Sequence, residues 1–186
     1  MKSIFFALLV IGIFCSHYNF ESDPEIAELL DDLRKHDLSD FEYDDIPENG
    51  REFLKGLLDG LGVIDDIKNF EKCIQNFNQI IEKLKAIVEL LKKINIHNVK
   101  EVAAKLIEIG RAIGTLLAPC VKEGTVLAKI LMLIKNANLA MIAKNILLHL
   151  PRFIEAAKLA ITGVTSGNYY NAGVGLGRML RIALGV

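Results

Sequence analysis

The chain has 186 residues, of which 52% are hydrophobic, and this length and composition suit one domain with a sizeable apolar core. Tryptophan is absent and aromatic residues make up 7% of the chain, so only Tyr169 and Tyr170 loosely fit a stacking platform, and nucleic acid is excluded as a partner. The formal net charge of −1 hides an asymmetry, because residues 21–52 carry 13 acidic and 3 basic side chains, whereas residues 53–186 carry 10 acidic and 18 basic ones.

The first predicted element is a secretory signal peptide at residues 1–16. Lys2 is followed by an unbroken apolar run from Ile4 to Phe14, which is too short to span a bilayer comfortably and ends in small or polar residues. A buried N-terminal helix is the alternative interpretation. The segment predicts a protein that is secreted or held in the lumen of a secretory compartment.

An acidic segment, residues 17–50, comes next. The sequence Ser22-Asp23-Pro24 offers a capping side chain and a proline for the first helical position. Apolar residues then recur at helical spacing: Ile26, Leu29, Leu30 and Leu33. These features predict one short helix at about 24–35 and then a linker up to residue 50 that has turn residues and no periodicity, so the segment is expected to be partly disordered.

Two interpretations of the acidic segment remain open. It is either a solvated linker ahead of a mildly basic domain, or a segment that folds over the cationic body and neutralises it until it is cut off. The dipeptide Arg34-Lys35 offers a dibasic site for such a cut. The second interpretation would make the segment a mask.

Residues 51–186 are predicted to form the helical bundle domain. Apolar residues keep a 3–4 spacing almost without interruption, and no window alternates apolar and polar residues as a strand would. The expected helices cover residues 53–61, 64–94, 98–118, 121–135, 139–150, 151–163 and 168–185. The stretch 64–94 is either one long helix or two helices that break near residues 76–78. The pattern predicts an all-α fold, a compact bundle of six or seven amphipathic helices.

Polar residues at several helix starts predict caps. Asn98 with Glu101 three residues later has the form of a capping box. Asn138 is expected to cap the helix that follows it, and Ser166 or Asn168 to cap the last helix.

Two cysteines remain once the signal peptide is removed, Cys73 and Cys120. An even pair in an exported chain is most simply a disulfide. Closing a loop of this length stabilises a fold by about 4 kcal/mol in the chain-entropy model. The alternatives are two free thiols or a metal site, but no histidine or cysteine lies at ligand spacing from either residue. We therefore predict a Cys73–Cys120 disulfide and no metal site.

Catalytic and nucleotide-binding motifs are missing from the sequence. There is no G-x-S-x-G turn, and the acidic pair Asp65-Asp66 lies at a predicted helix start, where it complements the helix dipole. The stretch GVGLG, which contains Gly173, Gly175 and Gly177, follows a helix and a turn instead of a strand, so it does not fit a dinucleotide loop. We predict no catalytic residue and no cofactor, and we do not expect an enzyme.

Three glycine pairs are each spaced four residues apart inside predicted helices: Gly56 and Gly60, Gly110 and Gly114, and Gly173 and Gly177. Glycine inside a helix costs about 1 kcal/mol relative to alanine, so these pairs need a compensating gain. On one helix face they let a neighbouring backbone approach closely, as in G-x-x-x-G contacts, and we assign them to close helix packing. The alternative is a flexible or membrane-inserting helix. A fourth pair, Gly163 and Gly167, straddles a predicted turn and carries no assignment.

One pattern extends through most of the chain: FLKGLLDGLG from Phe53, then Cys73 after a helical run, TLLAPC ending at Cys120, and the closing stretch GNYYNAGVGLGRMLRIAL. In this pattern residues 50–186 resemble a group of small exported helical proteins found in ciliates. The resemblance implies the signal peptide, the Cys73–Cys120 bridge and the helical fold. It implies no catalytic residue.

Two functions are open at this point, and an enzyme of unknown class ranks below both. The first is a non-enzymatic secreted or secretory-compartment protein that acts by binding a protein partner or as luminal content. The second is a lipid-binding or membrane-active bundle whose cationic body, with a net charge of +8 over residues 53–186, contacts anionic membranes peripherally and is masked by the acidic segment. Basic residues interrupt every long apolar window after residue 120, so no integral membrane span is expected in the mature chain.

Overall fold

The computed structural model of the chain describes residues 23–35, 47–63, 77–93, 98–119, 121 and 123–186. Within these ranges the regular elements are α-helices and no β-strand occurs, which confirms the all-α prediction. The helices are α2 (Pro24–Arg34), α3 (Pro47–Leu61), α4 (Phe77–Leu91), α5 (Val99–Leu117), α6 (Val126–Lys135), α7 (Leu139–Leu148), α8 (Leu150–Thr165) and α9 (Tyr169–Leu184). The predicted signal peptide lies outside the described residues, as do Cys73 and Cys120.

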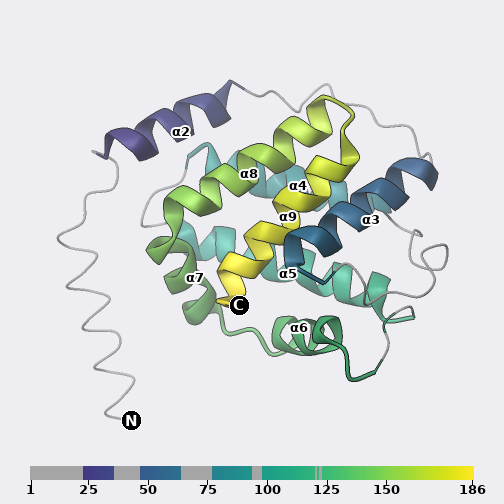
Figure 1. Ribbon diagram of the computed structural model, residues 1–186. Helices are drawn as coiled ribbons and strands as arrows, with labels where there is room; N and C mark the ends of the chain where they lie inside the picture. Colours follow the sequence, from purple (N-terminus) through teal and green to yellow (C-terminus); the bar gives the residue numbers. More distant parts are fainter. Residues whose placement is uncertain (1–22, 36–46, 64–76, 94–97, 120, 122) are drawn as a thin grey trace, which may run out of the picture.

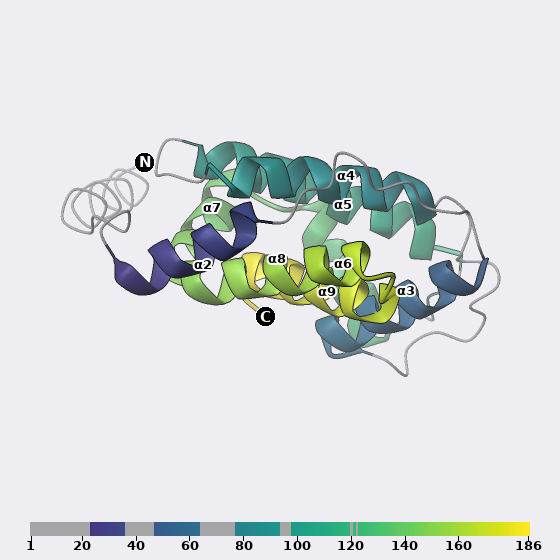
Figure 2. The ribbon, with the colours of Figure 1, turned by 90° about the horizontal axis from the view of Figure 1, so that it is seen from above.

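The helices form two layers, and α9 lies inside one of them. Seen from above, α4 and α5 make up one layer, and α2, α8, α9 and α3 make up the other (Figure 2). α9 lies between α3 and α8 and contacts these two helices more extensively than any other (Figure 1). α6 packs mainly on α5 and lies below it in Figure 1, on the side of the molecule opposite α2.

The core is aliphatic, and it contains no buried polar or charged side chain among the described residues. Phe53 and Phe153 are its largest fully buried side chains. The buried residues of α9 lie on more than one of its faces and include three glycines and two alanines, while Arg178 and Arg181 are exposed. A helix that is apolar on more than one face is one that packs between others, so α9 is the central element of its layer.

Two predicted helix caps are confirmed. The Asn138 side chain accepts hydrogen bonds from the backbone N–H groups of Ala140 at 2.9 Å and Met141 at 3.3 Å, at the start of α7. The Asn168 side chain accepts one from the N–H of Asn171 at 3.0 Å, at the start of α9. Both asparagines satisfy N–H groups that have no partner inside the helix.

The predicted capping box at α5 is wrong. Asn98 precedes the helix, but its side chain makes no capping hydrogen bond, and its φ and ψ of −99° and −2° are not those of the extended conformation typical of a cap. Instead, its side-chain amide donates to the carbonyl oxygen of Lys93 at 2.7 Å. The side chain therefore ties the start of α5 to the turn after α4, and Glu101 has no role in a box with it.

Two predicted helix starts are wrong and a third is untested. α6 begins at Val126 instead of residue 121, because the residues directly before it form a turn. α3 begins at Pro47, so the predicted linker to residue 50 is too long, and Gly50 is buried. Proline suits the first turn of a helix because its missing N–H would have no partner there. α4 begins at Phe77, and residues 64–76, on which the continuity of the predicted helix over 64–94 depends, lie outside the described residues.

Candidate functional site

The glycine pairs Gly56/Gly60 of α3 and Gly173/Gly177 of α9 face each other. A Cβ atom added to Gly173 would overlap the carbonyl oxygen of Phe53 in α3. A Cβ added to Gly177 would lie 2.9 Å from the Cα of Gly60, closer than real Cβ atoms approach. The structure thus brings two helix backbones into direct contact, and these four glycines have a structural role in the bundle.

The remaining predicted pair, Gly110 and Gly114 of α5, does not lie against a backbone. A Cβ on Gly110 would be 2.8 Å from Cγ2 of Ile134, a side chain of α6. The nearest atom to a Cβ on Gly114 would be Cδ2 of Leu131 at 4.0 Å, which is an ordinary van der Waals distance. Side chains of α6 therefore cover this pair, and close packing does not require a glycine at position 114.

Two further close approaches were missed by the sequence prediction. Gly175 lies against α8, where an added Cβ would be 2.6 Å from the carbonyl oxygen of Ala156 and 2.7 Å from the Cα of Ala160. Gly163 of α8 lies against α9, where an added Cβ would be 2.8 Å from the Cα of Ala172. Ala156 and Ala160 are themselves four residues apart. This small-x-x-x-small spacing is the sequence signal from which the contact could have been predicted.

The described residues contain no metal site, and the carboxylate and the phenol at their polar recess are paired within the protein. No group of three His, Cys, Asp or Glu side chains is placed there to hold a metal ion. An open polar recess of about 360 Å³ lies at the start of α9. Its carboxylate, Glu52, is paired with Lys55 at 2.6 Å. The Tyr170 hydroxyl donates to Asp59 at 2.6 Å, and this hydrogen bond raises the pKa of Tyr170. Both polar groups are thus held by the protein itself.

Exposed hydrophobic side chains are concentrated on α6 and α7. Among the described residues seven large hydrophobic side chains are exposed, and only Val186, near the C-terminal end of α9, lies elsewhere. The other six define what we call the α6–α7 apolar surface: Val126, Met132, Leu133, Leu139, Met141 and Leu148. Single exposed hydrophobic residues are normal on proteins, but six of them on two consecutive helices indicate an interaction site.

The α6–α7 apolar surface carries positive charge and no negative charge. No acidic residue occurs between Glu123 and Glu155 in the sequence. In the same interval, Lys129, Lys135 and Lys144 are exposed. Residues three and four apart share a helix face, so Lys129 and Lys135 flank Met132, which is 65% exposed. The surface therefore combines apolar contact area with cationic side chains.

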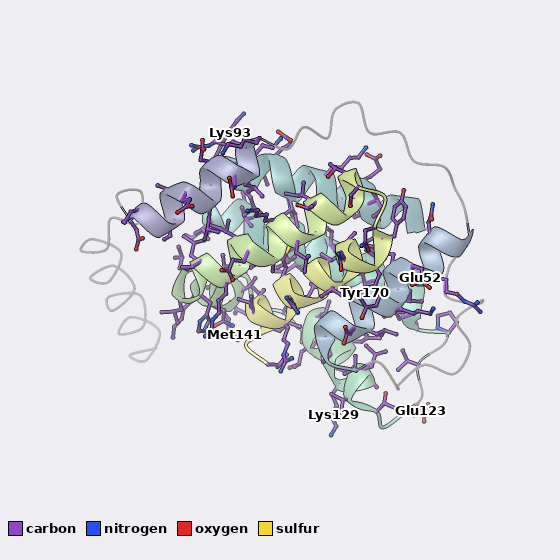
Figure 3. The ribbon with its side chains drawn as sticks, turned by 45° about the horizontal axis from the view of Figure 1, so that its top comes forward. Glu52, Lys93, Glu123, Lys129, Met141 and Tyr170 are labelled. Atoms are coloured by element: carbon purple, nitrogen blue, oxygen red, sulfur yellow. The ribbon has the colours of Figure 1, made fainter. Side chains whose placement is uncertain are left out.

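On α7 the same combination recurs. Met141 and Leu148 are seven residues apart on the outward face, and Lys144 lies between them. Figure 3 shows Met141 of α7 and Lys129 of α6 along the same lower edge of the molecule. The spacing of Met141 matches the apolar stripe of α7, but its side chain is 43% exposed.

α6 and α7 form a sharply bent pair. Residues 136–138 join them, and the two helix axes are bent by 113°. No single helix in the described part of the chain is long and apolar enough to cross a membrane. Taken together, α6 and α7 reach the length and the mean hydropathy of a span, on length and composition alone.

The helix of the acidic segment packs on the body. α2 lies on α8, and it buries Leu33 fully and leaves only 6% of Leu30 exposed. Asp32 pairs with Lys158 of α8 at 2.6 Å, and Arg34 donates to the carbonyl oxygen of Lys92 at 2.9 Å. The solvated-linker interpretation is therefore wrong for α2.

We expect the Asp32–Lys158 pair to make stability depend on acidic pH. The hydrogen bond from Lys158 is the main cause that lowers the pKa of Asp32 below its ordinary value of 3.8, with Lys35 as the next. Because the folded-state pKa is the lower one, the stabilisation is complete above the unfolded-state pKa and is lost as pH falls through the folded-state pKa. In urea titrations, Asp32→Asn should therefore lower the free energy of unfolding at pH 7 and have no effect below the folded-state pKa. An equal effect at both pH values would contradict this.

Comparisons of the chain with models of protein families, with curated proteins and with solved structures found no match. The resemblance to exported ciliate proteins therefore remains a prediction from the sequence pattern.

Proposed function

We propose that the protein is a non-enzymatic exported helical protein that attaches peripherally to anionic membranes through the α6–α7 apolar surface. The observation that carries this proposal is that, among the residues that the structure describes, six of the seven exposed large hydrophobic side chains lie on two consecutive helices. The sequence between Glu123 and Glu155 adds basic residues and no acidic ones. Apolar area and positive charge on one surface are the two features that bind a helix to an anionic bilayer.

The outward faces of α6 and α7 suit the boundary between lipid head groups and acyl chains. Met132 and Met141 have long unbranched side chains that reach into the acyl region and adapt to an irregular surface. Lysine side chains at positions 129, 135 and 144 have apolar stems and charged ends, so they lie along such a surface while their ammonium groups meet lipid phosphates. Both helices would then lie in the membrane surface instead of crossing it.

The position of α2 bears on the predicted masking by the acidic segment. α2 neutralises Lys158 of α8, whereas α6 lies on the opposite side of the molecule (Figure 1). In our proposal α2 therefore leaves the α6–α7 apolar surface open. A protein partner that covers the same surface is the alternative, and the experiment below separates it from a membrane.

Flotation with vesicles tests the proposal. We expect the protein to float with vesicles of phosphatidylcholine and 30% phosphatidylglycerol, and to bind far less to phosphatidylcholine alone. The double variant Lys129→Gln/Lys144→Gln should lose about 30-fold in affinity, since each lysine near an anionic surface contributes about 1 kcal/mol. Met132→Asp combined with Leu148→Asp should abolish binding, because it places carboxylates in the apolar contact area.

Matched controls exist for both kinds of substitution. Lys100→Gln removes an exposed lysine from α5, and Val186→Asp replaces the exposed hydrophobic residue that lies outside the α6–α7 apolar surface. Both control variants should bind as the unmodified chain does. Equal binding by control and surface variants, or no binding to anionic vesicles at all, would overturn the proposal, and the second result would favour a protein partner.

A further inference from the structure

The methionines of the chain differ sharply in exposure. The sequence contains four, of which Met1 lies in the predicted signal peptide, outside the described residues. Met132 on α6 and Met141 on α7 are 65% and 43% exposed, whereas Met179 on α9 has no exposed surface. Among the described residues, the two methionines that solvent reaches therefore both belong to the α6–α7 apolar surface.

Exposure decides which thioether an oxidant in solution attacks. Met132 has the largest exposed fraction of the large hydrophobic side chains that the structure describes, so its sulfur is open to water. Met179 belongs to the apolar core, and α9 packs between α3 and α8. A water-borne oxidant reaches such a residue only when the fold opens. Oxidation of the folded chain is therefore directed to the α6–α7 apolar surface.

We propose that a hydroperoxide oxidises Met132 and Met141 to methionine sulfoxide, and that this modification prevents attachment to the membrane. With hydrogen peroxide, the sulfur lone pair attacks one peroxide oxygen, and the O–O bond breaks as the S–O bond forms. The proton on the transferred oxygen passes to the departing hydroxide, which leaves as water. The sulfur loses two electrons and the peroxide gains them, so the reaction balances.

This inference rests on the proposed function, because it names a reaction that regulates the same surface. Export, which the proposed function includes, would place the chain outside the reducing cytosol. Methionine sulfoxide is reduced back to methionine by dedicated reductases, so the modification is reversible. The α6–α7 apolar surface thus contains the means of switching its own attachment.

The sulfoxide weakens the apolar part of the attachment and leaves the charges unchanged. A thioether side chain is apolar and adapts to lipid chains, whereas a sulfoxide is polar and holds a hydrogen bond to water. Lysines 129, 135 and 144 keep their charge in the oxidised protein. The bundle stays folded, because Met179 in its core remains a thioether.

Limited oxidation with hydrogen peroxide, followed by vesicle flotation, tests the inference. The anionic vesicles have saturated acyl chains, so the peroxide does not attack the lipid. Peptide mapping by mass spectrometry should find one added oxygen on Met132 and one on Met141, and none on Met179. The oxidised chain should bind about 30-fold more weakly, since two side chains lose most of the gain of leaving water. Methionine sulfoxide reductases for both sulfoxide epimers should restore binding.

Two double variants serve as controls. Met132→Leu/Met141→Leu keeps the apolar area and the three cysteines of the chain but removes both exposed thioethers. It should bind as the unmodified chain does, before and after peroxide treatment. Met132→Gln/Met141→Gln imitates the sulfoxide with a polar group of similar size and should bind as weakly as the oxidised chain without any treatment. Thermal melts of all forms should coincide, because both positions are exposed.

Flotation of the untreated chain separates this inference from the proposed function. If the untreated chain floats with anionic vesicles and the oxidised chain floats equally well, the inference is wrong and the proposed function stands. Loss of binding after peroxide treatment in the leucine variant would also overturn the inference, as would oxidation of Met179 as fast as that of the exposed pair. If neither the untreated chain nor the leucine variant binds anionic vesicles, both the proposed function and the inference fail.

Discussion

Replacing Gly173 by alanine is expected to lower the free energy of unfolding by about 3 kcal/mol. The added methyl group would overlap the carbonyl oxygen of Phe53 and would lie 2.6 Å from the backbone nitrogen of Leu57. Backbone atoms inside α3 cannot rotate away as a side chain can, so α3 and α9 must separate along their whole contact. Urea unfolding followed by circular dichroism measures the loss as a lower midpoint at an unchanged slope.

Gly114→Ala provides the matched control for this experiment, because it makes the same chemical change inside another helix. Its added methyl group would have Leu131 at 4.0 Å and no closer neighbour from another element. Alanine is the better helix former, so this variant should be more stable than the unmodified chain by about 0.5–1 kcal/mol. Similar shifts for the two variants, in either direction, would contradict the backbone contact between α3 and α9.

Leu33→Ala in α2 is expected to lower the free energy of unfolding by about 3 kcal/mol. Its side chain has no exposed surface, because α2 lies on α8 and Leu33 belongs to the same apolar core as the bundle helices. Leu29, four residues earlier, is only partly buried, and Leu29→Ala should cost less than half as much. A thermal or urea melt of both variants compares the two positions.

An unchanged midpoint for Leu33→Ala would show that α2 contributes nothing to the folded unit.

A loss of stability in Leu33→Ala would have a consequence for the acidic segment as a whole. A cut at Arg34-Lys35 would leave α2 held by its apolar stripe and by the Asp32–Lys158 pair, so cleavage alone would not release it. Masking that depends on removal of the segment would then need unfolding of α2 as well.

The bundle divides into a tightly packed centre and a more loosely held edge. At the centre, α9 is in backbone contact with α3 through Gly173 and Gly177 and with α8 through Gly175. At the edge, α6 has only three buried side chains and exposes others. Elements that move on binding are those with few buried contacts, so the edge is where binding and motion are expected.

Local signals in the sequence were sufficient for part of this structure. The 3.6-residue periodicity predicted the helices. Asn138 was correctly predicted as a cap, and Asn168 was one of two candidates for the last helix, because a cap depends only on the residues of the first helical turn. Asn98 was predicted wrongly for a reason outside that turn. Its side-chain amide donates to the carbonyl oxygen of Lys93, five residues earlier in the chain. A capping pattern considers only the residues at the start of the helix, so it does not include Lys93.

Helical periodicity and glycine spacing alone predicted that the chain is helical, where several helices begin and that the glycines at positions 56, 60, 173 and 177 have a close neighbour. The packed structure was needed to show which helices meet at those glycines, that α2 packs on α8, and that Met141 is exposed although its spacing matches the apolar stripe of its helix. The physical reason is that periodicity reports an apolar face but not what covers it. Whether an apolar helix face is buried depends on which distant segments pack against it. The other helices leave part of the apolar surface of α6 and α7 exposed.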